Sequence, residues 1–392
     1  MKEAVIVSAV RTAVGKAPRG MYRTTMPETL AVTAIRGALE RAPGLDPAEI
    51  DDVMMGCAFP EAEQGLNIGR NYALLAGLPE SVPGFTMNRF CSSGLQAVAL
   101  GAQAIMSGMA EVVLAAGVES MSRVPGGGNK EMFSNEMMDA SPDIYLSMGL
   151  TAENVASRFG VTREQQDALA AESHRRALEA IANGTFKDEV VPVEIKHRLP
   201  GPEGSVVETS TTVTIDEGPR PGSTVEALAK LRPVFKKDGT VTAGNSSQTS
   251  DGAAAAVLMT AERAAALGLQ PLARFVSFAA AGCDPGVMGI GPVFAIPKAL
   301  KLAGLTVSDI DLVELNEAFA SQAYYCIQTL GFDPAIVNVN GGAVALGHPL
   351  GATGAKLTAT LLHEMKRRRS RYGVVSMCVA GGIGAAAVFE RL

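Results

Sequence analysis

The chain repeats part of its own sequence, and this repeat constrains the fold more than any other feature. Residues 45–59 align without a gap with residues 305–319, at an offset of 260 positions (305 − 45). The positions that recur identically are Leu45, Ile50, Asp51, Val53, Ala58 and Phe59. Self-similarity at a fixed spacing indicates a duplicated structural unit. We therefore expect two related halves that pack about a pseudo-twofold axis.

Strand and helix patterns alternate within the halves. Residues 4–10 are almost entirely apolar, as in a strand that is buried on both faces. Helical patterns over residues 27–41 and 68–76 alternate with apolar strand patterns over residues 53–59 and 111–117. This alternation predicts an α/β fold, in which a mainly parallel sheet is covered by helices. Together with the repeat, it predicts two α/β halves with central mixed sheets and buried helices.

A long segment interrupts this alternation after Glu119. Residues 121–150 are rich in Met, Gly and Pro, residues 163–183 show the pattern of an exposed amphipathic helix, and residues 186–240 are polar. The α/β alternation resumes at Leu272. Long excursions from a compact fold usually serve binding. We expect three parts: an N-terminal half of residues 1–118 completed by about 248–271, a loop domain of residues 119–247, and a C-terminal half of residues 272–392.

Charge argues against nucleic acid as a partner. The net charge is −6 over 392 residues, whereas backbone phosphates require clustered Lys and Arg. One basic run, residues 366–371, ends a helical pattern. Cations are favourable at that end of a helix, so we interpret the run as a solvated helix terminus.

Cysteine usage and the N-terminal sequence indicate the compartment. The five cysteines include no C-x-x-C spacing, which suggests neither disulfide staples nor structural zinc. Free thiols imply a reducing compartment. The chain enters a strand pattern at Ala4 without a leader-like segment, and no sufficiently long apolar run lacks charges and turn residues. We therefore expect a cytoplasmic protein with no membrane span.

Cys91 lies between a strand pattern and a helix pattern. Residues 82–87 end an extended apolar run, and residues 95–106 are apolar or small nearly all round, as in a buried helix. The unpaired N–H groups and the positive dipole end of that helix would stabilise a thiolate, so we expect a lowered Cys91 pKa and a nucleophile. The alternative is a core cysteine, because free cysteines are often buried.

His348 occupies a comparable place in the second half. Of the four histidines it alone is embedded in small residues, so that a substrate could approach it closely. The alternative is a core histidine satisfied by backbone groups. An offset of 257 positions (348 − 91) places Cys91 opposite His348 and Gly94 opposite Gly351. Each residue would then lie at the strand-to-helix turn of its own half, where related turns can converge on one site.

Two further polar positions stand at strand ends. Cys378 follows an apolar strand pattern and precedes a glycine-rich turn, so it is either core filling or an acid/base group. Asn316 and Glu317 follow the apolar strand pattern of residues 311–315. Buried there, both side chains would need hydrogen-bond partners.

These positions fall in four blocks that resemble, in order, the active-site blocks of the thiolase family. The blocks are residues 88–94, 316–319, 347–349 and 378–382. The resemblance extends over nearly the whole chain. Within the family, three further stretches resemble the degradative 3-ketoacyl-CoA thiolases more than the biosynthetic acetoacetyl-CoA enzymes, namely residues 216–221, 230–233 and 244–248.

The resemblance implies a two-step acyl transfer without metal or redox cofactor. Cys91 would be the nucleophile, His348 the base, Cys378 the acid, and Asn316 the residue that fixes a water. The backbone N–H groups of Cys91 and Ala380 would hold the acyl oxygen. Many members carry glycine where this chain has Ala380. Alanine keeps the backbone N–H, provided that the backbone conformation at this position is one that alanine can adopt.

The resemblance also implies that coenzyme A is a substrate and that the protein is a homodimer or homotetramer. Acyl-CoA and CoA are the expected small-molecule partners. The residues that the family would use for CoA are Arg220 for the adenine, Ser247 along the pantetheine, and Met148, Met288 and Phe319 for the thioester channel. For the methionines, ordinary core filling is the alternative.

Three functions compete at this stage. The first is thiolytic cleavage of 3-ketoacyl-CoA, as in fatty acid β-oxidation. The second is the same chemistry in the condensing direction, which makes acetoacetyl-CoA. The third is a thiolase-like protein that binds lipid or CoA without turnover, although a pure binder needs none of Cys91, His348 and Cys378. A condensing enzyme with carrier-protein substrates is disfavoured, because the second active-site histidine expected of many such enzymes is absent at Asn316.

Overall fold

The computed structural model describes residues 2–130, 132–200 and 205–392, and most of their strands join one mixed sheet. Across this sheet the strands follow the order β11 (Leu312–Leu315), β12 (Tyr372–Val379), β13 (Ile383–Glu390), β10 (Ala273–Gly282), β1 (Ala4–Thr12), β9 (Ser250–Thr260), β5 (Val112–Ser120), β3 (Asp52–Gly56) and β4 (Gly84–Met87). Two short strands join its margins, β2 (Gly15–Lys16) on β9 and β6 (Val190–Val191) on β1.

The strand order shows the duplication. In the first half the order is β3-β5-β9-β1, and in the second half it is β11-β12-β13-β10. The pairing register carries the offset seen in the sequence: Asp52 pairs with Val113, and Leu312 pairs with Gly373 (312 − 52 = 260 and 373 − 113 = 260). The α/β fold and its internal repeat, both predicted from the sequence, are confirmed. The expectation of a mainly parallel sheet is wrong, because the pairs β1–β9, β1–β10, β5–β9, β10–β13 and β12–β13 are antiparallel.

The two halves meet edge to edge through β1 and β10. These strands pair antiparallel, Val5 with Arg274 and Ile6 with Ala273. Moving each residue of one pair to its counterpart 268 positions away (273 − 5 and 274 − 6) gives the other pair, so the pseudo-twofold axis passes between them. The central sheets that we predicted for the two halves are therefore limbs of one continuous sheet.

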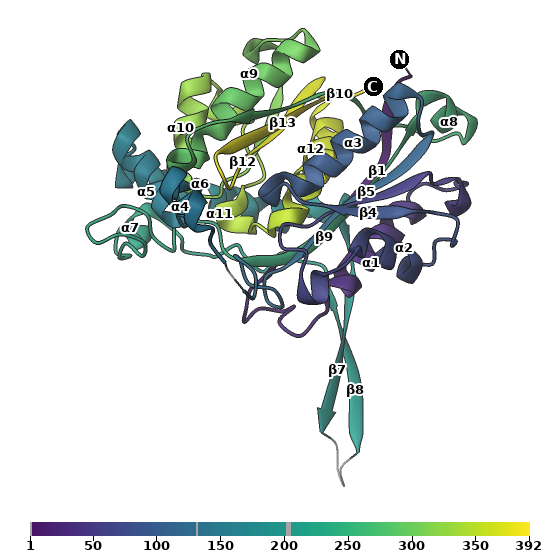
Figure 1. Cartoon of the computed structure of the whole chain (residues 1–392), viewed down its shortest axis with the longest axis horizontal. Coiled ribbons are helices and arrows are strands. Elements are labelled where there is room, and N and C mark those ends of the chain that lie inside the picture. Colours follow the sequence, from purple (N-terminus) through teal and green to yellow (C-terminus); the bar gives the residue numbers. More distant parts are fainter. Residues whose placement is uncertain (1, 131, 201–204) are drawn as a thin grey trace.

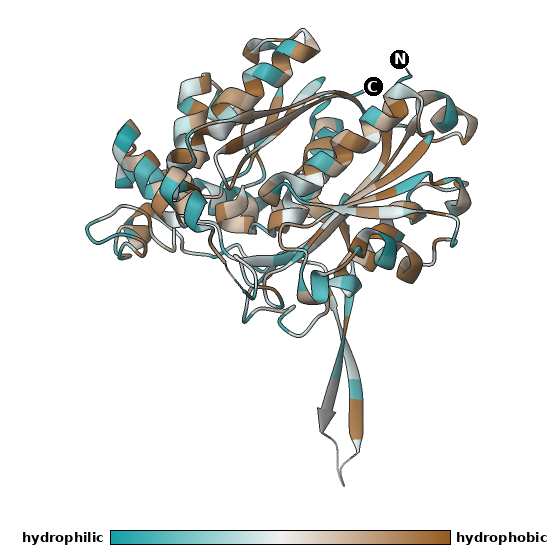
Figure 2. Cartoon of the chain, viewed as in Figure 1, coloured by the Kyte–Doolittle hydropathy of each residue, from teal (hydrophilic) through white to brown (hydrophobic). Residues whose placement is uncertain are grey.

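Helices form three layers around the two limbs (Figure 1). The outer layer of the first half contains α1 (Pro27–Glu40) and α2 (Ile68–Ala76), and that of the second half contains α9 (Gly291–Ala303) and α10 (Ala320–Leu330). Between the limbs, α3 (Ser93–Ser107) packs against α12 (Leu350–Arg368). Figure 2 shows apolar residues concentrated on strands such as β1 and β5.

The helix α3 is buried nearly all round, as its sequence predicts. Leu95, Val98 and Ile105 are fully buried in a core that also contains Leu357 and Leu361 of α12. A helix without a polar face is stable only where protein covers it on all sides. The burial of α3 and α12 places the beginnings of both helices, and the turns that precede them, inside the protein.

Glycines allow the first turns of α3 and α12 to cross closely. A Cβ atom added to Gly94 would lie 2.8 Å from the Ala355 backbone nitrogen and 2.9 Å from the Gly351 carbonyl oxygen. A Cβ atom on Gly354 would overlap the backbone of Leu95. Because backbone cannot move aside as a flexible side chain can, these helices cross only where no side chain intervenes.

Replacing Gly354 with alanine is expected to lower the free energy of unfolding by about 1–3 kcal/mol, because overpacking forces apart two buried helices. Urea denaturation would measure the change. Gly282→Ala is the control, since the nearest atom to its added Cβ lies 3.9 Å away. Equal stability of the Gly354 variant and the wild type would contradict this account of the crossing.

The segment between β5 and β9 contains helices and a projecting hairpin. Its helices are α4 (Asn135–Ala140), α5 (Met148–Phe159), α6 (Arg163–Ala182) and α7 (Val225–Leu228), and its hairpin pairs β7 (Val193–Pro200) with β8 (Val206–Val213). The hairpin extends away from the body of the protein (Figure 1) and was not predicted. The predicted helix at residues 163–183 is α6, but it is not simply exposed, because Gln166, Ala170 and Ala177 are buried.

Two short helices and one apolar helical stretch complete the described chain. The short helices are α8 (Ala261–Ala266) and α11 (Ala343–Leu346). The stretch Pro285–Ala303, which includes α9, is long and apolar enough to cross a membrane by length and composition alone. It packs against β10 and β13, and 61% of its apolar window is buried in the protein, as in a core helix.

Candidate active site

Cys91 lies in a short turn that joins β4 to α3. A single 3₁₀ turn, Phe90–Ser92, carries it directly into the first residue of α3. Two side chains fix this turn: Asn88 Oδ1 accepts the Phe90 N–H at 2.7 Å, and Ser93 Oγ accepts the Arg89 N–H at 2.9 Å. Phe90 has a left-handed φ of +42°, a strained conformation that persists only where the surroundings impose it. The position of the Cys91 thiol is therefore rigidly defined.

The predicted lowering of the Cys91 pKa is wrong. Burial raises the pKa of the Cys91 thiol to about 12, although the backbone N–H groups of Ala380 and of Cys91 itself favour the thiolate. The loss of solvent around a buried charge outweighs the N–H groups and dipole of the helix terminus. The thiol is thus protonated at rest, and a base must take its proton when it reacts.

Ala380 presents its N–H to Cys91 from the turn that joins β12 to β13. The left-handed conformations of this turn fall on Gly381 (φ +81°) and Gly382 (φ +78°), and Ala380 has no such φ. Alanine is therefore accommodated where many thiolases carry glycine. Two N–H groups, from the two halves of the fold, point to the Cys91 sulfur.

Cys378 lies in β12, two residues before Ala380, and is fully buried. Burial raises the pKa of its thiol, and the neighbouring Cys91 raises it further, so the two sulfur atoms lie within one electrostatic environment. Cys378 belongs to a small apolar cluster, whose other members are Ala152, Val241, Met288, Ala318 and Phe319, with Met148 packed against it. The structure thus brings three predicted channel residues, Met148, Met288 and Phe319, to Cys378.

His348 lies in the turn between α11 and α12, and a hydrogen-bond chain fixes its ring. Thr353 Oγ1 donates to the Pro349 carbonyl oxygen at 3.0 Å, so it accepts a hydrogen bond from His348 Nδ1 at 2.6 Å. This arrangement assigns the ring proton to Nδ1 and leaves Nε2 unprotonated. The Nδ2 atom of Asn316 lies 3.4 Å from Nε2, on the donor side of that contact.

His348 is neutral. Burial lowers the pKa of its imidazole to about 3, and the positive charge of Lys356 acts in the same direction. A neutral imidazole with a free Nε2 can accept a proton from a thiol. The site therefore rests as a neutral thiol and a neutral ring, not as an ion pair.

The turns that carry Cys91 and His348 converge where α3 and α12 cross. The turn Phe90–Ser92 packs against both α12 and β12. Gly351, three residues after His348, touches the first turn of α3 and the residues that follow β3. Each half thus supplies the turn before its central helix to one seam, with the thiol from one half and the imidazole from the other. The predicted strand-to-helix turn at His348 is wrong, because the short helix α11 precedes α12.

The buried Glu317 carboxylate has the hydrogen-bond partners that we predicted it would need. Its carboxylate accepts hydrogen bonds from Asn338 Nδ2 at 2.9 Å, Ser173 Oγ at 2.7 Å and the Val344 N–H at 3.2 Å. A cavity of about 260 Å³ between α6 and α10 reaches this carboxylate, and a second cavity of about 310 Å³ lies beside Phe186. Neither cavity is lined by Cys91 or His348, so the chemistry of the side chains, not cavity size, marks the site.

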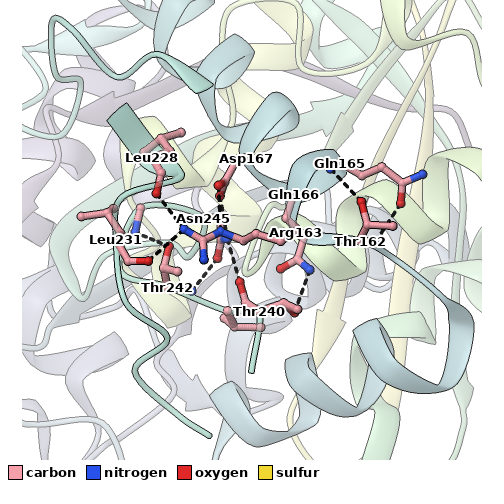
Figure 3. Close-up of polar contacts among 12 residues, drawn as sticks. Thr162, Arg163, Gln165, Gln166, Asp167, Leu228, Leu231, Thr240, Thr242 and Asn245 are labelled. Atoms are coloured by element: carbon pink, nitrogen blue, oxygen red, sulfur yellow. Dashed lines mark hydrogen bonds and ion pairs between the residues drawn. The ribbon is translucent and has the colours of Figure 1, made fainter. Parts of the chain in front are cut away.

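The loop that contains Ser247 is held in place by a buried polar network (Figure 3). Asn245 Nδ2 donates to Asp167 Oδ1 at 2.9 Å and to the Thr240 carbonyl oxygen at 3.1 Å, and Asn245 Oδ1 accepts the Thr242 N–H at 2.8 Å. Arg163 completes the network through Asp167. These contacts tie the loop to α6.

Ser247 lies against the block that contains Asn316. Its N–H donates to the Ala318 carbonyl oxygen at 2.9 Å, and the adjacent Ser246 forms a bridge with Phe319. Arg220 is exposed. Its backbone N–H donates to Nδ1 of His174, a residue of α6, at 3.2 Å. Burial lowers the pKa of nearby Lys16, and the positive charge of Arg220 lowers it further. The two cations therefore lie close together.

Two residues of the site were missed from the sequence. Thr353 orients His348 from the first turn of α12. Glu119, at the end of β5, accepts the Gly351 N–H and the Ala58 N–H, each at 2.8 Å. A carboxylate in an otherwise apolar strand was the available signal for Glu119, whereas nothing in its sequence context distinguishes Thr353 from other helix residues.

A duplicated α/β fold with a buried thiol, a neutral imidazole and a second thiol at the seam of its halves is an arrangement suited to cysteine-dependent acyl transfer. Two family models match the chain: the thiolase N-terminal domain over residues 4–262 and the thiolase C-terminal domain over residues 269–391. The chain belongs to the thiolase family.

Relatives and a solved structure agree with this assignment. The chain is 56% identical to "3-ketoacyl-CoA thiolase" of Bacillus subtilis (strain 168), over 100% of both chains. It is 49% identical to the human "3-ketoacyl-CoA thiolase, peroxisomal", over 99% of this chain and 91% of the human one. The crystal structure of the Bacillus anthracis acetyl-CoA acetyltransferase superposes with a TM-score of 0.91 at 42% identity, covering 100% of this chain and 99% of that one.

Proposed function

We propose that the protein cleaves 3-ketoacyl-CoA with CoA, giving acetyl-CoA and a shortened acyl-CoA, as in fatty acid β-oxidation. The observation that carries the proposal is the Cys91 thiol, which receives N–H groups from both halves and lies in the electrostatic environment of a second thiol, Cys378. Full-length relatives named 3-ketoacyl-CoA thiolase support the choice of substrate.

In the first step, His348 Nε2 takes the proton of Cys91, and the sulfur attacks C3 of the substrate. The bond between C2 and C3 then breaks, which leaves an acyl group on Cys91 and an acetyl-CoA enolate. Cys378 gives its proton to C2 of the enolate. The proton on His348 then passes to the Cys378 thiolate, which restores both groups to their neutral forms.

Two sets of groups would stabilise the charges that develop on oxygen. The N–H groups of Cys91 and Ala380 would hold the acyl oxygen, and the loss of one such donor typically costs about 3 kcal/mol in the transition state. The enolate oxygen would meet His348 and a water fixed by Asn316. The Asn316 Oδ1 atom is buried and makes no hydrogen bond with the described part of the chain, which leaves it available as an acceptor.

In the second step, the thiol of free CoA loses its proton to His348 and attacks the acyl carbon. The Cys91 sulfur leaves and takes the proton back from His348. In this proposal residues 119–247 form a loop domain over the CoA site, with Arg220 at the adenine and Ser247 along the pantetheine. Met148, Met288 and Phe319 would line the thioester channel beside Cys378.

Location and assembly complete the proposal. Free cysteines and a bacterial relative of full length support a cytoplasmic protein. We further propose a homodimer or homotetramer, which sedimentation at several protein concentrations would test.

The function is tested by steady-state rates of thiolysis across substrates from short to long acyl chains. Thiolysis of substrates longer than acetoacetyl-CoA is the expected result. Turnover of acetoacetyl-CoA alone, mainly in the condensing direction, would favour the biosynthetic alternative. CoA binding without any turnover would favour the non-catalytic one.

Replacing Thr353 with valine should lower kcat for thiolysis by about 10- to 100-fold with little change in KM, because a hydrogen bond to a group that becomes charged is worth about 1.5–3 kcal/mol. Without Thr353 Oγ1, the imidazolium that forms on His348 loses the acceptor of its Nδ1 proton. Thr358→Val is the matched control, since that buried hydroxyl of α12 donates only to the Gly354 carbonyl oxygen. Equal effects of the two substitutions would contradict the role of Thr353.

A further inference from the structure

We propose that Glu119 is a positioning residue that joins the two catalytic turns and that acts on Cys91 through its negative charge. The proposal rests on the roles proposed above for Cys91 and His348. Glu119 is fully buried at the end of β5, and neither the repeat nor the four family-like blocks contain it.

Five hydrogen-bond donors converge on the Glu119 carboxylate. Oε2 accepts the N–H groups of Ala58 and Gly351, each at 2.8 Å. The donors to Oε1 are Gln64 Nε2 at 2.8 Å, the Phe59 N–H at 3.3 Å and the Cys57 thiol at 3.8 Å. All five groups are hydrogen-bond donors. If the carboxyl group were protonated, its own O–H would point at one of these donors and neither would have an acceptor. The carboxylate is therefore ionised, although burial raises its pKa.

The donors come from both halves of the fold. Ala58, Phe59, Gln64 and Cys57 follow β3 in the first half, whereas Gly351 opens α12 in the second half, three residues after His348. Gly351 packs tightly against the first half, since a Cβ atom added to it would lie 2.8 Å from Glu119 Oε2 and 2.6 Å from Cys57 Cα. Glu119 thus fixes the start of α12, and with it the His348 turn, against the half that carries Cys91.

The same carboxylate acts on Cys91 through its charge. The titratable groups near Cys91 include Glu119 from β5 and Cys378 from β12, together with the proposed base His348 in the turn before α12, and Cys57 lies beside Glu119. A negative charge in a buried site opposes a second one, so Glu119 adds to the raised pKa of the thiol. The Cys91 sulfur then becomes nucleophilic only as His348 takes its proton, which limits unwanted alkylation or oxidation of the resting enzyme.

Two substitutions separate the effect of the Glu119 charge from the effect of its side-chain length. Glu119→Gln removes the charge and turns an amide N–H toward donors. We expect alkylation of Cys91 by iodoacetamide to be about tenfold faster at a fixed mildly alkaline pH, a change that corresponds to one pKa unit. We also expect kcat for thiolysis to fall at least about tenfold, because an amide offers one acceptor oxygen instead of two and its NH2 group opposes one set of the donors that join the turns.

Glu119→Asp keeps the charge but is too short to hold Ala58 and Gly351 together. Its kcat should fall at least about tenfold, while alkylation of Cys91 stays within about twofold of the wild type. The control is Glu364→Gln, which removes a buried carboxylate from the other end of α12, where Glu364 pairs with Arg367 and Arg368. That control should leave the alkylation rate of Cys91 unchanged.

The results for these variants and for the wild type test the role of Glu119 separately from the proposed function. Unchanged or slower alkylation in Glu119→Gln, or a kcat in Glu119→Asp close to that of the wild type, overturns the proposal. If Glu119→Gln does not fold, kcat of Glu119→Asp decides the positioning role, and alkylation of Cys91 in Glu119→Ala decides the effect of the charge. Failure of the wild-type Cys91 to accept an acyl group from substrate would instead overturn the proposed function. A wild type that is acylated, with variants that behave like it, would overturn only the role of Glu119.

Discussion

Substitution of Cys91 with serine should lower kcat for thiolysis by on the order of 10⁴-fold or more, because it removes the group that carries the acyl intermediate. A hydroxyl group in the same buried place is a far weaker acid than the thiol. His348 therefore takes the proton of the serine hydroxyl far less readily than that of the thiol. Steady-state thiolysis and intact-protein mass measurement of the acyl-enzyme would both show the loss.

The control for this variant is Cys326→Ser. Cys326 is also a fully buried free cysteine, but it lies in α10 and its thiol donates to the Gly289 carbonyl oxygen. Its replacement should leave thiolysis close to the wild-type rate. Normal thiolysis by a folded Cys91→Ser protein would remove Cys91 as the nucleophile.

Substitution of Cys378 with serine should separate the two halves of the reaction. Acyl-CoA should still acylate Cys91, because that step needs only Cys91, His348 and the two N–H groups. Proton exchange at C2 of acetyl-CoA should fall by about 10²- to 10⁴-fold, the usual contribution of a positioned acid/base group. The serine hydroxyl is a far weaker acid than the thiol, so proton transfer between it and C2 is slower in both directions.

Deuterium incorporation into acetyl-CoA would report this exchange, and mass measurement would report the acylation of Cys91. The pair of results distinguishes a proton donor from a residue that merely fills the core. Loss of both activities in a folded Cys378→Ser protein would point to a structural role, and retention of exchange would assign the proton transfer to another group.

The sequence predicts the large features of this fold because they follow from local patterns. The repeat of residues 45–59 predicts the duplicated strand order, and the apolar composition of residues 95–106 predicts the buried α3. The turns at Cys91 and His348 lie at matching places in the two halves because the duplicated units share one topology. The hairpin of β7 and β8 was missed, since the apolar alternation is limited to Val193 and Ile195 at the start of β7, and β8 is exposed along almost its whole length.

The electrostatics of the site could not be predicted from local patterns. The position of Cys91 at a helix N-terminus suggested a lowered pKa, but the opposite shift depends on how completely distant segments bury the thiol. Glu119 meets Gly351 across 232 positions of sequence, so its role becomes visible only when the halves are assembled. The tautomer of His348 likewise depends on a threonine hydroxyl whose direction the sequence does not specify.

The central claim is that turns from two duplicated halves form one acyl-transfer site, with Cys91 from one and His348 from the other. Peptide mass mapping after brief exposure to 3-ketoacyl-CoA without free CoA tests it most directly. We predict an acyl group on the peptide that contains Cys91, and its loss when His348 is replaced with alanine. An acyl group on any other residue, or undiminished acylation of Cys91 in the folded His348→Ala protein, would contradict it.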